Sequence, residues 1–135
     1  MEARYTYSGD LDVEVDGNVA VVRAVQSAAQ LRRGGRLWAK VGPYVLLFSE
    51  GTRDLFVDYP GLAAVRVTTV TAGGREVASA TLHRSALNDL TWRRALNIAG
   101  RARRDGTEKP TLLEDLVSWG EDHTEYTYNS SFTAR

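Results

Sequence analysis

Arginine is the residue type with the most binding chemistry in this sequence. It accounts for all but two of the 17 basic residues, and its planar guanidinium makes bidentate contacts with carboxylates and phosphates. Helical spacing places one group of arginines on one side of a predicted helix, and a second group surrounds a Gly-Gly pair. The candidate binding residues are Arg93, Arg101, Arg104 and Arg94 on the helix, and Arg32, Arg33 and Arg36 at the glycines.

These arginines fit three roles. An acidic protein surface and a phosphate backbone are both suitable partners, and Trp38 and Trp92 could stack on the bases of a nucleic acid. The third role is a solvated helix face without a partner. Trp92 falls in the middle of the apolar arc of its helix, which favours core packing for that ring.

The sequence offers little for metal binding or catalysis. The absence of cysteine excludes disulfides, thiolate metal sites and cysteine nucleophiles. Asp12, Glu14 and Asp16 are spaced like the start of a calcium loop, but Arg23 stands where the bidentate carboxylate is needed. The two histidines lack zinc-ligand spacing, and no glycine pair matches a phosphate-binding loop. We therefore expect a non-enzyme without metal or cofactor, and we identify no small-molecule substrate.

The acidic and basic residues are unevenly distributed along the chain. The net charge is +0, yet residues 1–16 and 110–135 each carry −4, while residues 17–53 carry +5 and residues 84–109 carry +4. Such blocks can be complementary within one fold or between subunits. They differ from the uniform positive excess of a typical nucleic-acid-binding protein.

Two β-hairpins are the strongest structural signals in the first two thirds of the chain. Residues 11–15 alternate in hydropathy and residues 19–25 are rich in valine, with Asp16-Gly17-Asn18 as the turn. Residues 64–71 and 75–83 also alternate around Gly73-Gly74, so we expect these two strands to pair antiparallel.

The segment between the hairpins also reads as strands. Residues 27–31 could form one helical turn that Gly34-Gly35 ends, and strands are predicted over 36–41, 44–48 and 54–58. Turns at Gly42-Pro43 and at residues 50–53 would join these strands, and Tyr59-Pro60-Gly61 would end the last one.

The last third changes to helical spacing. From Thr91 to Arg104 the apolar residues fall on one arc and the arginines on another, and Asp105-Gly106 ends the helix. After Pro110, Thr111 and Glu114 have the spacing of a capping box, which predicts a shorter helix ending near residue 120.

Residues 121–135 form a polar segment without helical spacing. Three aromatic residues lie in it, and we expect an extended arm that buries at least two of their rings against its own domain or a neighbour. These candidate interaction residues are Tyr126, Tyr128 and Phe132. The predicted organisation is one domain over residues 1–120 and an arm over residues 121–135.

Together these elements predict an α+β domain. We expect a mostly antiparallel meander sheet or partly open β-barrel, followed by one packing α-helix and a shorter C-terminal helix. The predicted function is a non-catalytic protein-interaction or assembly (structural) subunit, within a larger complex such as a viral particle, with a protein partner or self-association. The alternative is a nucleic-acid-binding module that uses the arginine-rich helix face.

The sequence also predicts where the protein works. No apolar run approaches the roughly 20 residues of a membrane span, and the first residues do not resemble a secretion signal. We therefore expect an intracellular (cytoplasmic) protein, or one inside a virion, without a membrane partner.

Overall fold

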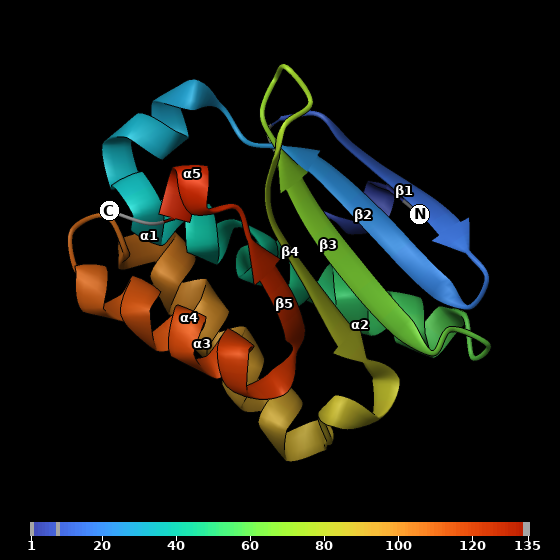
Figure 1. Cartoon of the computed structure of the whole chain (residues 1–135). Coiled ribbons are helices and arrows are strands. Elements are labelled where there is room, and N and C mark those ends of the chain that lie inside the picture. The colour runs from blue at the N-terminus through green and yellow to red at the C-terminus, as the bar shows by residue number, and fades with distance from the viewer. Residues whose placement is uncertain (1, 8, 134–135) are drawn as a thin grey trace.

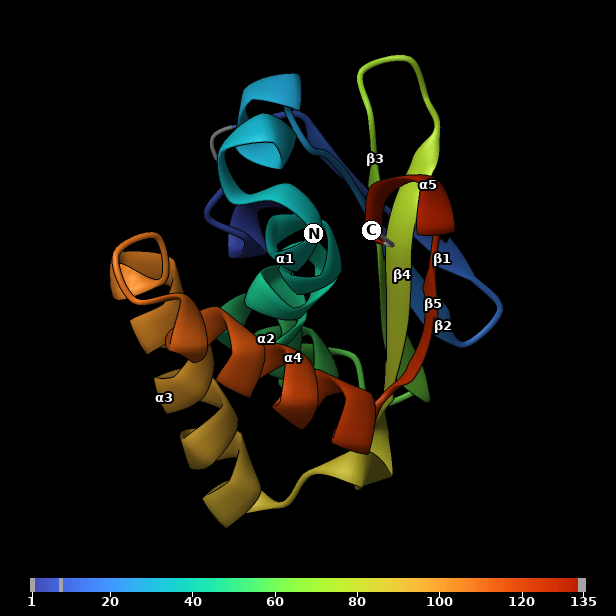
Figure 2. The ribbon, with the colours of Figure 1, turned by 60° about the vertical axis from the view of Figure 1, so that its left-hand side comes forward.

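The fold is α+β, with a mixed sheet that carries its helices on one face (Figures 1 and 2). The computed structural model describes residues 2–7 and 9–133, and describes the backbone alone for residues 2, 30 and 32–34. The five strands lie in the order β1-β2-β3-β4-β5. Three of the four neighbouring pairs are antiparallel, and β2 and β3 are parallel.

The first hairpin is confirmed. β1 (Leu11–Asp16) and β2 (Val19–Val25) pair antiparallel, with Asp16 opposite Val19. Gly17 has φ 63°, a left-handed conformation that glycine adopts at little cost in this two-residue turn. The inward side chains Ala20, Val22 and Ala24 are fully buried.

The second hairpin is also confirmed. β3 (Ala64–Val70) pairs antiparallel with β4 (Glu76–His83), and Ala64 lies opposite His83. The connecting turn includes Gly74, whose φ is 87°. The alternation around the two glycines therefore predicted both the strands and their pairing.

The strands expected between the hairpins are wrong. Residues 36–41, 44–48 and 54–58 lie instead mostly in two helices, α1 (Ala28–Leu47) and α2 (Glu50–Asp58). Residues 42–43 lie inside α1 and residues 50–53 begin α2, so the predicted turns are absent as well. A short apolar run does not by itself distinguish a buried strand from a buried helix, and here the buried run is helical.

These two helices also change the topology of the sheet. They form the crossover that parallel strands require, and they bring β3 beside β2. The sheet is therefore antiparallel-dominated and mixed, and the meander is only partly right. Figure 2 shows the helices together on one side of the open sheet.

A glycine interrupts α1. Gly35 has φ 56° and ψ −143°, so the first helical turns stop there, as the Gly-Gly pair predicted. The chain then resumes a helix that runs through Pro43 to Leu47. The strand expected from residue 36 onward is absent because the resumed helix buries Val41, Tyr44 and Leu47 completely.

The predicted arginine-bearing helix is confirmed as α3 (Asp89–Asp105). Its capping box is formed by Asn88 and Thr91, which bond reciprocally through side chain and backbone. The capping box expected at Thr111 is wrong, because α4 (Pro110–His123) begins at Pro110 after the N-cap Lys109, without a side-chain cap. Gly106 caps α3 with φ −62°, and a Cβ there would lie 2.4 Å from Leu113 Cδ2, so close packing is what requires glycine.

The C-terminal segment docks on its own domain. Residues 121–123 complete α4, β5 (Glu125–Tyr128) pairs antiparallel with β4, and α5 (Ser130–Thr133) follows. Two short 3₁₀ turns, η1 (Glu2–Arg4) and η2 (Arg84–Ala86), complete the elements of the described chain.

The core lies between the sheet and the helices, with α1 at its centre. α1 packs on β3 and β4 with one side and on α3 and α4 with the other. The largest completely buried side chains include Tyr44, Phe48, Leu55, Leu82 and Leu116. No helix within the described ranges is long and apolar enough to cross a membrane.

Candidate functional site

Four of the predicted arginines form one exposed face of α3. We call Arg93, Arg94, Arg101 and Arg104 the arginine face; all four are exposed. The opposite side of the helix buries Trp92, Ala95, Ala99 and Ala102 against the core. None of the four forms an ion pair with a side chain in the described part of the chain.

Arg36 of the second arginine cluster does not join this face. Arg36 is exposed in α1, directly after the kink at Gly35. The side chains of Arg32 and Arg33 lie outside the described residues. Figures 1 and 2 both show the first turns of α1 standing apart from α3.

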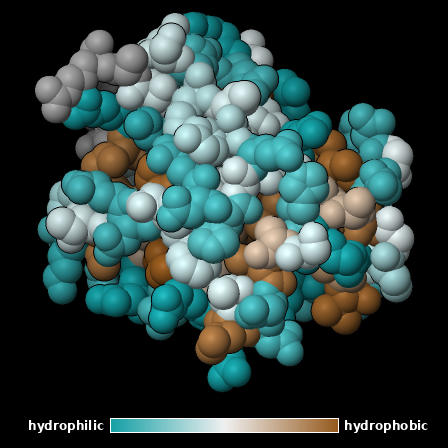
Figure 3. Space-filling view, turned by 60° about the horizontal axis from the view of Figure 1, so that its bottom comes forward, coloured by the Kyte–Doolittle hydropathy of each residue, from teal (hydrophilic) through white to brown (hydrophobic). Residues whose placement is uncertain are grey.

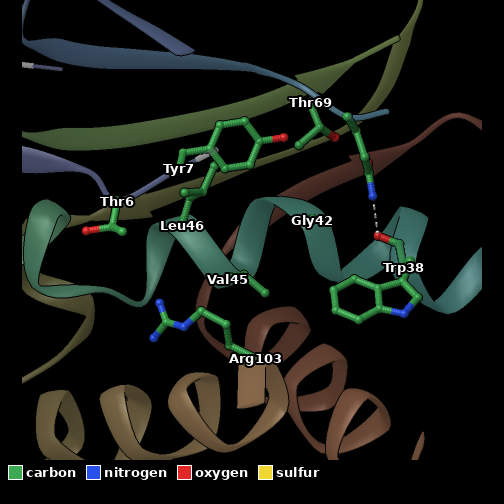
Figure 4. Close-up of a pocket in the computed structure, with 9 residues that line it drawn as sticks. Thr6, Tyr7, Trp38, Gly42, Val45, Leu46, Thr69 and Arg103 are labelled. Carbon is green, nitrogen blue, oxygen red and sulfur yellow. Dashed lines mark hydrogen bonds between the residues drawn. The ribbon is translucent and has the colours of Figure 1, made fainter. Parts of the chain in front are cut away.

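A cavity of about 280 Å³ lies beside α1, on the side where the N-terminal segment crosses it (Figure 4). We call it the inner cavity. Residues from the N-terminal segment, the end of β2, β3, α1 and α3 line it together. These residues are Thr6, Tyr7, Gln26, Trp38, Gly42, Val45, Leu46, Thr69 and Arg103.

The polar groups of this cavity are mostly satisfied within the fold. The hydroxyl of Tyr7 donates to the carbonyl of Val25, and Thr69 Oγ1 donates to the carbonyl of Ala78 at 3.3 Å. Burial raises the pKa of Tyr7, which keeps this hydroxyl protonated and donating.

Gln26 is the exception among these groups. Its side chain is 4% exposed, and its Nε2 donates to the carbonyl of Trp38 at 2.9 Å. Its Oε1 is buried without a hydrogen-bond partner among the described residues. Most buried polar atoms are paired, so an unpaired one in a cavity wall requires an explanation.

A second cavity, of about 460 Å³, adjoins the first, and we call it the outer cavity. The two share Thr6, Val45, Leu46 and Arg103. The outer cavity also holds charges of both signs, from Arg4, Arg104, Glu50 and Asp54. Arg4 is already engaged, since it pairs with Asp58 at 2.5 Å.

Arg103 was not anticipated as a site residue. It comes 11 residues, or about three helical turns, after Trp92, and therefore lies on the side of α3 that faces α1 rather than on the arginine face. Figure 4 shows its side chain reaching from α3 toward Val45 and Thr6. Position on the helix could have separated Arg103 from the other arginines, whereas nothing in the sequence marked Gln26 as buried.

The expected interaction arm lies along its own sheet. Tyr126 is 42% exposed, and Tyr128 and Phe132 are half-buried, so none of the three rings is buried. The hydroxyls of Tyr44 and Tyr128 are 2.7 Å apart, and Tyr128 donates to Glu121 Oε2 at 2.9 Å. Burial raises the pKa of Tyr44 to about 12 and also raises the pKa of Tyr128, so both hydroxyls remain neutral donors. This cluster fastens β5 to α1 and α4.

The candidate metal ligands are dispersed or already paired. The His83 ring lies 2.9 Å from Glu125, and the His123 ring stacks on Trp119 with centroids 4.1 Å apart. Asp12, Glu14 and Asp16 lie on β1, as the hairpin interpretation predicts. Within the described ranges, no three histidine, aspartate or glutamate side chains gather closely enough to hold a metal ion.

The chain matches no protein-family model, and neither a curated protein nor a solved structure matches it significantly. The arginine face and the two cavities are therefore the candidate binding surfaces of this chain.

Proposed function

We propose that the protein is a non-catalytic interaction or assembly subunit that binds an acidic protein surface through the arginine face of α3. The observation that supports this proposal is the set of four exposed arginines on one helix without ion-pair partners among the described residues. Guanidinium groups in such an array can meet several carboxylates at once.

An exposed leucine within this face favours a protein partner. Leu90 is 69% exposed, and it precedes Arg93 and Arg94 by three and four residues, so the three share one side of α3. Figure 3 shows the end of the molecule at which α3 begins, where small hydrophobic areas are surrounded by hydrophilic surface. An apolar contact ringed by charges is typical of a protein interface.

The alternative, a nucleic-acid-binding module, lacks one of its expected features. Trp92 is 7% exposed in the core, so its ring is not available to stack on bases. Trp38 is half-buried and faces the inner cavity. Asp89 and Asp105 at the two ends of α3 also oppose a phosphate backbone.

The physical chemistry of exposed ion pairs sets the expected strength of binding. Each one contributes about 0–1 kcal/mol and weakens with salt. The arginine face therefore supplies orientation and a fast encounter, and contacts at Leu90 supply part of the affinity.

The test compares two triple variants that remove the same charge. The first is R93A/R101A/R104A on the arginine face; the second, R23A/R66A/R75A, removes three exposed arginines from the sheet side. Binding of a polyglutamate peptide and of single-stranded DNA is measured by fluorescence anisotropy, with sedimentation to follow self-association. We expect the first variant to bind the peptide about tenfold more weakly, and the second to bind it like the parent.

Other outcomes would contradict the proposal. Equal losses in the two variants would show that general charge, rather than α3, attracts the peptide. Tighter binding to DNA than to polyglutamate at about 0.15 M salt would support the nucleic-acid alternative instead.

A further inference from the structure

We propose that the partner of the arginine face is an acidic α-helix of another protein, which lies antiparallel along α3. This inference rests on the proposed function, because it specifies the shape of the acidic surface that the arginine face binds. Its basis is the spacing of the exposed residues along α3 and the difference between the two ends of that helix.

Five exposed residues form a continuous row along the outer side of α3. They follow one another at intervals of four, three, four and three residues, and we call them the contact row: Leu90, Arg94, Asn97, Arg101 and Arg104. Alternating steps of three and four average 3.5 residues, the repeat at which two helices stay in contact along their length. At 1.5 Å per residue, the row is about 21 Å long.

The contact row is free along its whole length. α3 buries the opposite side, which includes Trp92 and Ala99, and its contacts with other helices are to α1 and α4. Figure 2 shows α3 at the margin of the helical layer, with α1 and α4 on its inner side. The row contains no acidic residue, and its arginines make no ion pair with a described acidic side chain. An elongated acidic partner can therefore reach every position of the row.

The spacing of the charges favours a helical partner. Arg94 and Arg101 are one heptad apart, which corresponds to about 10.5 Å along the helix axis. Acidic residues one heptad apart on a second helix have the same separation, so successive carboxylates can face successive guanidinium groups. A partner that is already folded also loses less conformational entropy on binding than a flexible acidic tail does.

The two ends of the contact row determine the direction of the partner. Leu90, which is 69% exposed, lies at the start of α3, whereas Arg101 and Arg104 lie toward its end. Acidic residues stabilise a helix most in its first turn, where the helix dipole is positive. An antiparallel partner places its acidic first turns beside these two arginines and its last turns beside Leu90. The partner helix is therefore acidic at its start and carries an apolar residue about two heptads later.

Three helical peptides of about 20 residues test the spacing and the direction. The first carries acidic residues at heptad spacing in its first half and a leucine near its end. The second has the same residues in reverse order, and the third distributes the same acidic residues around the whole helix. Side-chain staples hold all three helical, which circular dichroism verifies. By fluorescence anisotropy with the full chain, we expect the first peptide to bind at least about tenfold more tightly than the other two or polyglutamate.

A pair of leucine and valine variants tests the apolar end of the contact row. Leu90 on α3 and Val57 on α2 are both 69% exposed. Leu90→Ala should weaken binding of the first peptide at least about threefold, because the truncation removes the apolar contact. Val57→Ala should leave this binding unchanged.

A charge exchange tests the alignment of the two helices. Arg101→Glu should weaken the first peptide at least about tenfold. A peptide with lysine in place of the acidic residue that faces position 101 should recover the binding, whereas lysine at the position that faces Arg94 should not. This rescue depends on the antiparallel alignment, so a general effect of net charge would not produce it.

The outcomes separate this inference from the proposed function. Equal binding of the three peptides and polyglutamate, lost in R93A/R101A/R104A, would retain an acidic partner and overturn the helix. Equal rescue by both lysine peptides would overturn the alignment. No binding of any acidic ligand would overturn both proposals. Tighter association with a second copy of the chain than with any peptide, measured by sedimentation, would assign the contact row to self-association instead.

Discussion

Gly120 of α4 lies where the ring of Tyr44 packs against that helix. A Cβ at position 120 would lie 2.4 Å from Tyr44 Cε1 and 2.5 Å from its Cδ1. Because Tyr44 is completely buried, its ring cannot swing aside into solvent. The missing side chain therefore allows α1 and α4 to approach each other.

We predict that Gly120→Ala destabilises the protein by about 1–3 kcal/mol through overpacking. The measurement is the free energy of unfolding from urea titration. Gly100→Ala in α3 is the matched control, because the nearest atom to its Cβ would be Arg104 Nη1 at 3.5 Å. That control should stabilise the helix by about 1 kcal/mol, and a similar effect at position 120 would contradict the close packing.

Tyr5 gives a second prediction at the scale of single residues. Its hydroxyl lies 2.7 Å from Thr52 Oγ1, and burial raises its pKa from 10.0 to about 12. Between pH 10 and pH 12 the unfolded chain therefore loses a proton that the folded protein keeps. The contribution of Tyr5 to the free energy of unfolding is therefore fully present below pH 10, and it is lost as the pH rises toward 12.

We predict that Tyr5→Phe makes this alkaline decrease shallower, by up to about 3 kcal/mol between pH 10 and pH 12. Urea unfolding at a series of pH values measures it, with the exposed Tyr59 changed to Phe as the control. Parallel pH profiles for the parent and Tyr5→Phe would show that Tyr5 does not contribute.

At the scale of elements, local sequence patterns correctly predicted the two hairpins and α3. The helical state of α1 was not predicted, because it depends on packing. Each hairpin signal, a glycine-containing turn with alternating hydropathy on both sides, is contained in about 20 consecutive residues. The apolar arc of α3 is equally local. α1 instead contains Gly34, Gly35, Gly42 and Pro43, which are poor helix formers. Its helical state depends on burial between the sheet and α4, which no local pattern reveals.

The candidate site also has one part that local sequence patterns predict and one part that only the tertiary structure reveals. The arginine face follows from spacing within one helix. The inner cavity requires α1, α3, two strands and the N-terminal segment to meet, so its contacts depend on the correct state of α1. Gln26 is a polar residue directly after a valine-rich strand, and only the tertiary structure shows that it is buried.

β5 provides a prediction about an element. It covers the edge of β4, with Tyr128 opposite Ala78 and Tyr126 opposite Ala80. We predict that deleting residues 125–135 lowers the unfolding free energy by at least about 2 kcal/mol and promotes aggregation, because β4 becomes an open edge. Tyr126→Ala, at an exposed ring, should change stability by less than about 0.5 kcal/mol.

Urea unfolding and light scattering of the truncated chain distinguish two roles for this segment. Lost stability identifies β5 as part of the domain. Unchanged stability together with lost polyglutamate binding or self-association would identify an interaction arm instead.

At the scale of the whole molecule, charge is separated across the fold. Asp12, Glu14 and Asp16 are exposed on β1, and the arginine face lies on α3. Figures 1 and 2 both place β1 and α3 on opposite sides of the molecule. Asp12 lies opposite the exposed Arg23 of β2, so Glu14 and Asp16 carry the net negative charge of the β1 edge. This acidic edge of one copy is complementary to the arginine face of another.

A contact between two different surfaces of identical chains is heterologous, and such contacts continue into open chains or close into rings. We predict that the sedimentation coefficient rises with protein concentration at low salt, and that about 0.5 M salt removes this rise. D12N/E14Q/D16N should abolish the rise while leaving polyglutamate binding intact, whereas R93A/R101A/R104A should weaken both. A monomer at every concentration, with polyglutamate binding retained, would identify the acidic surface as one on a different protein.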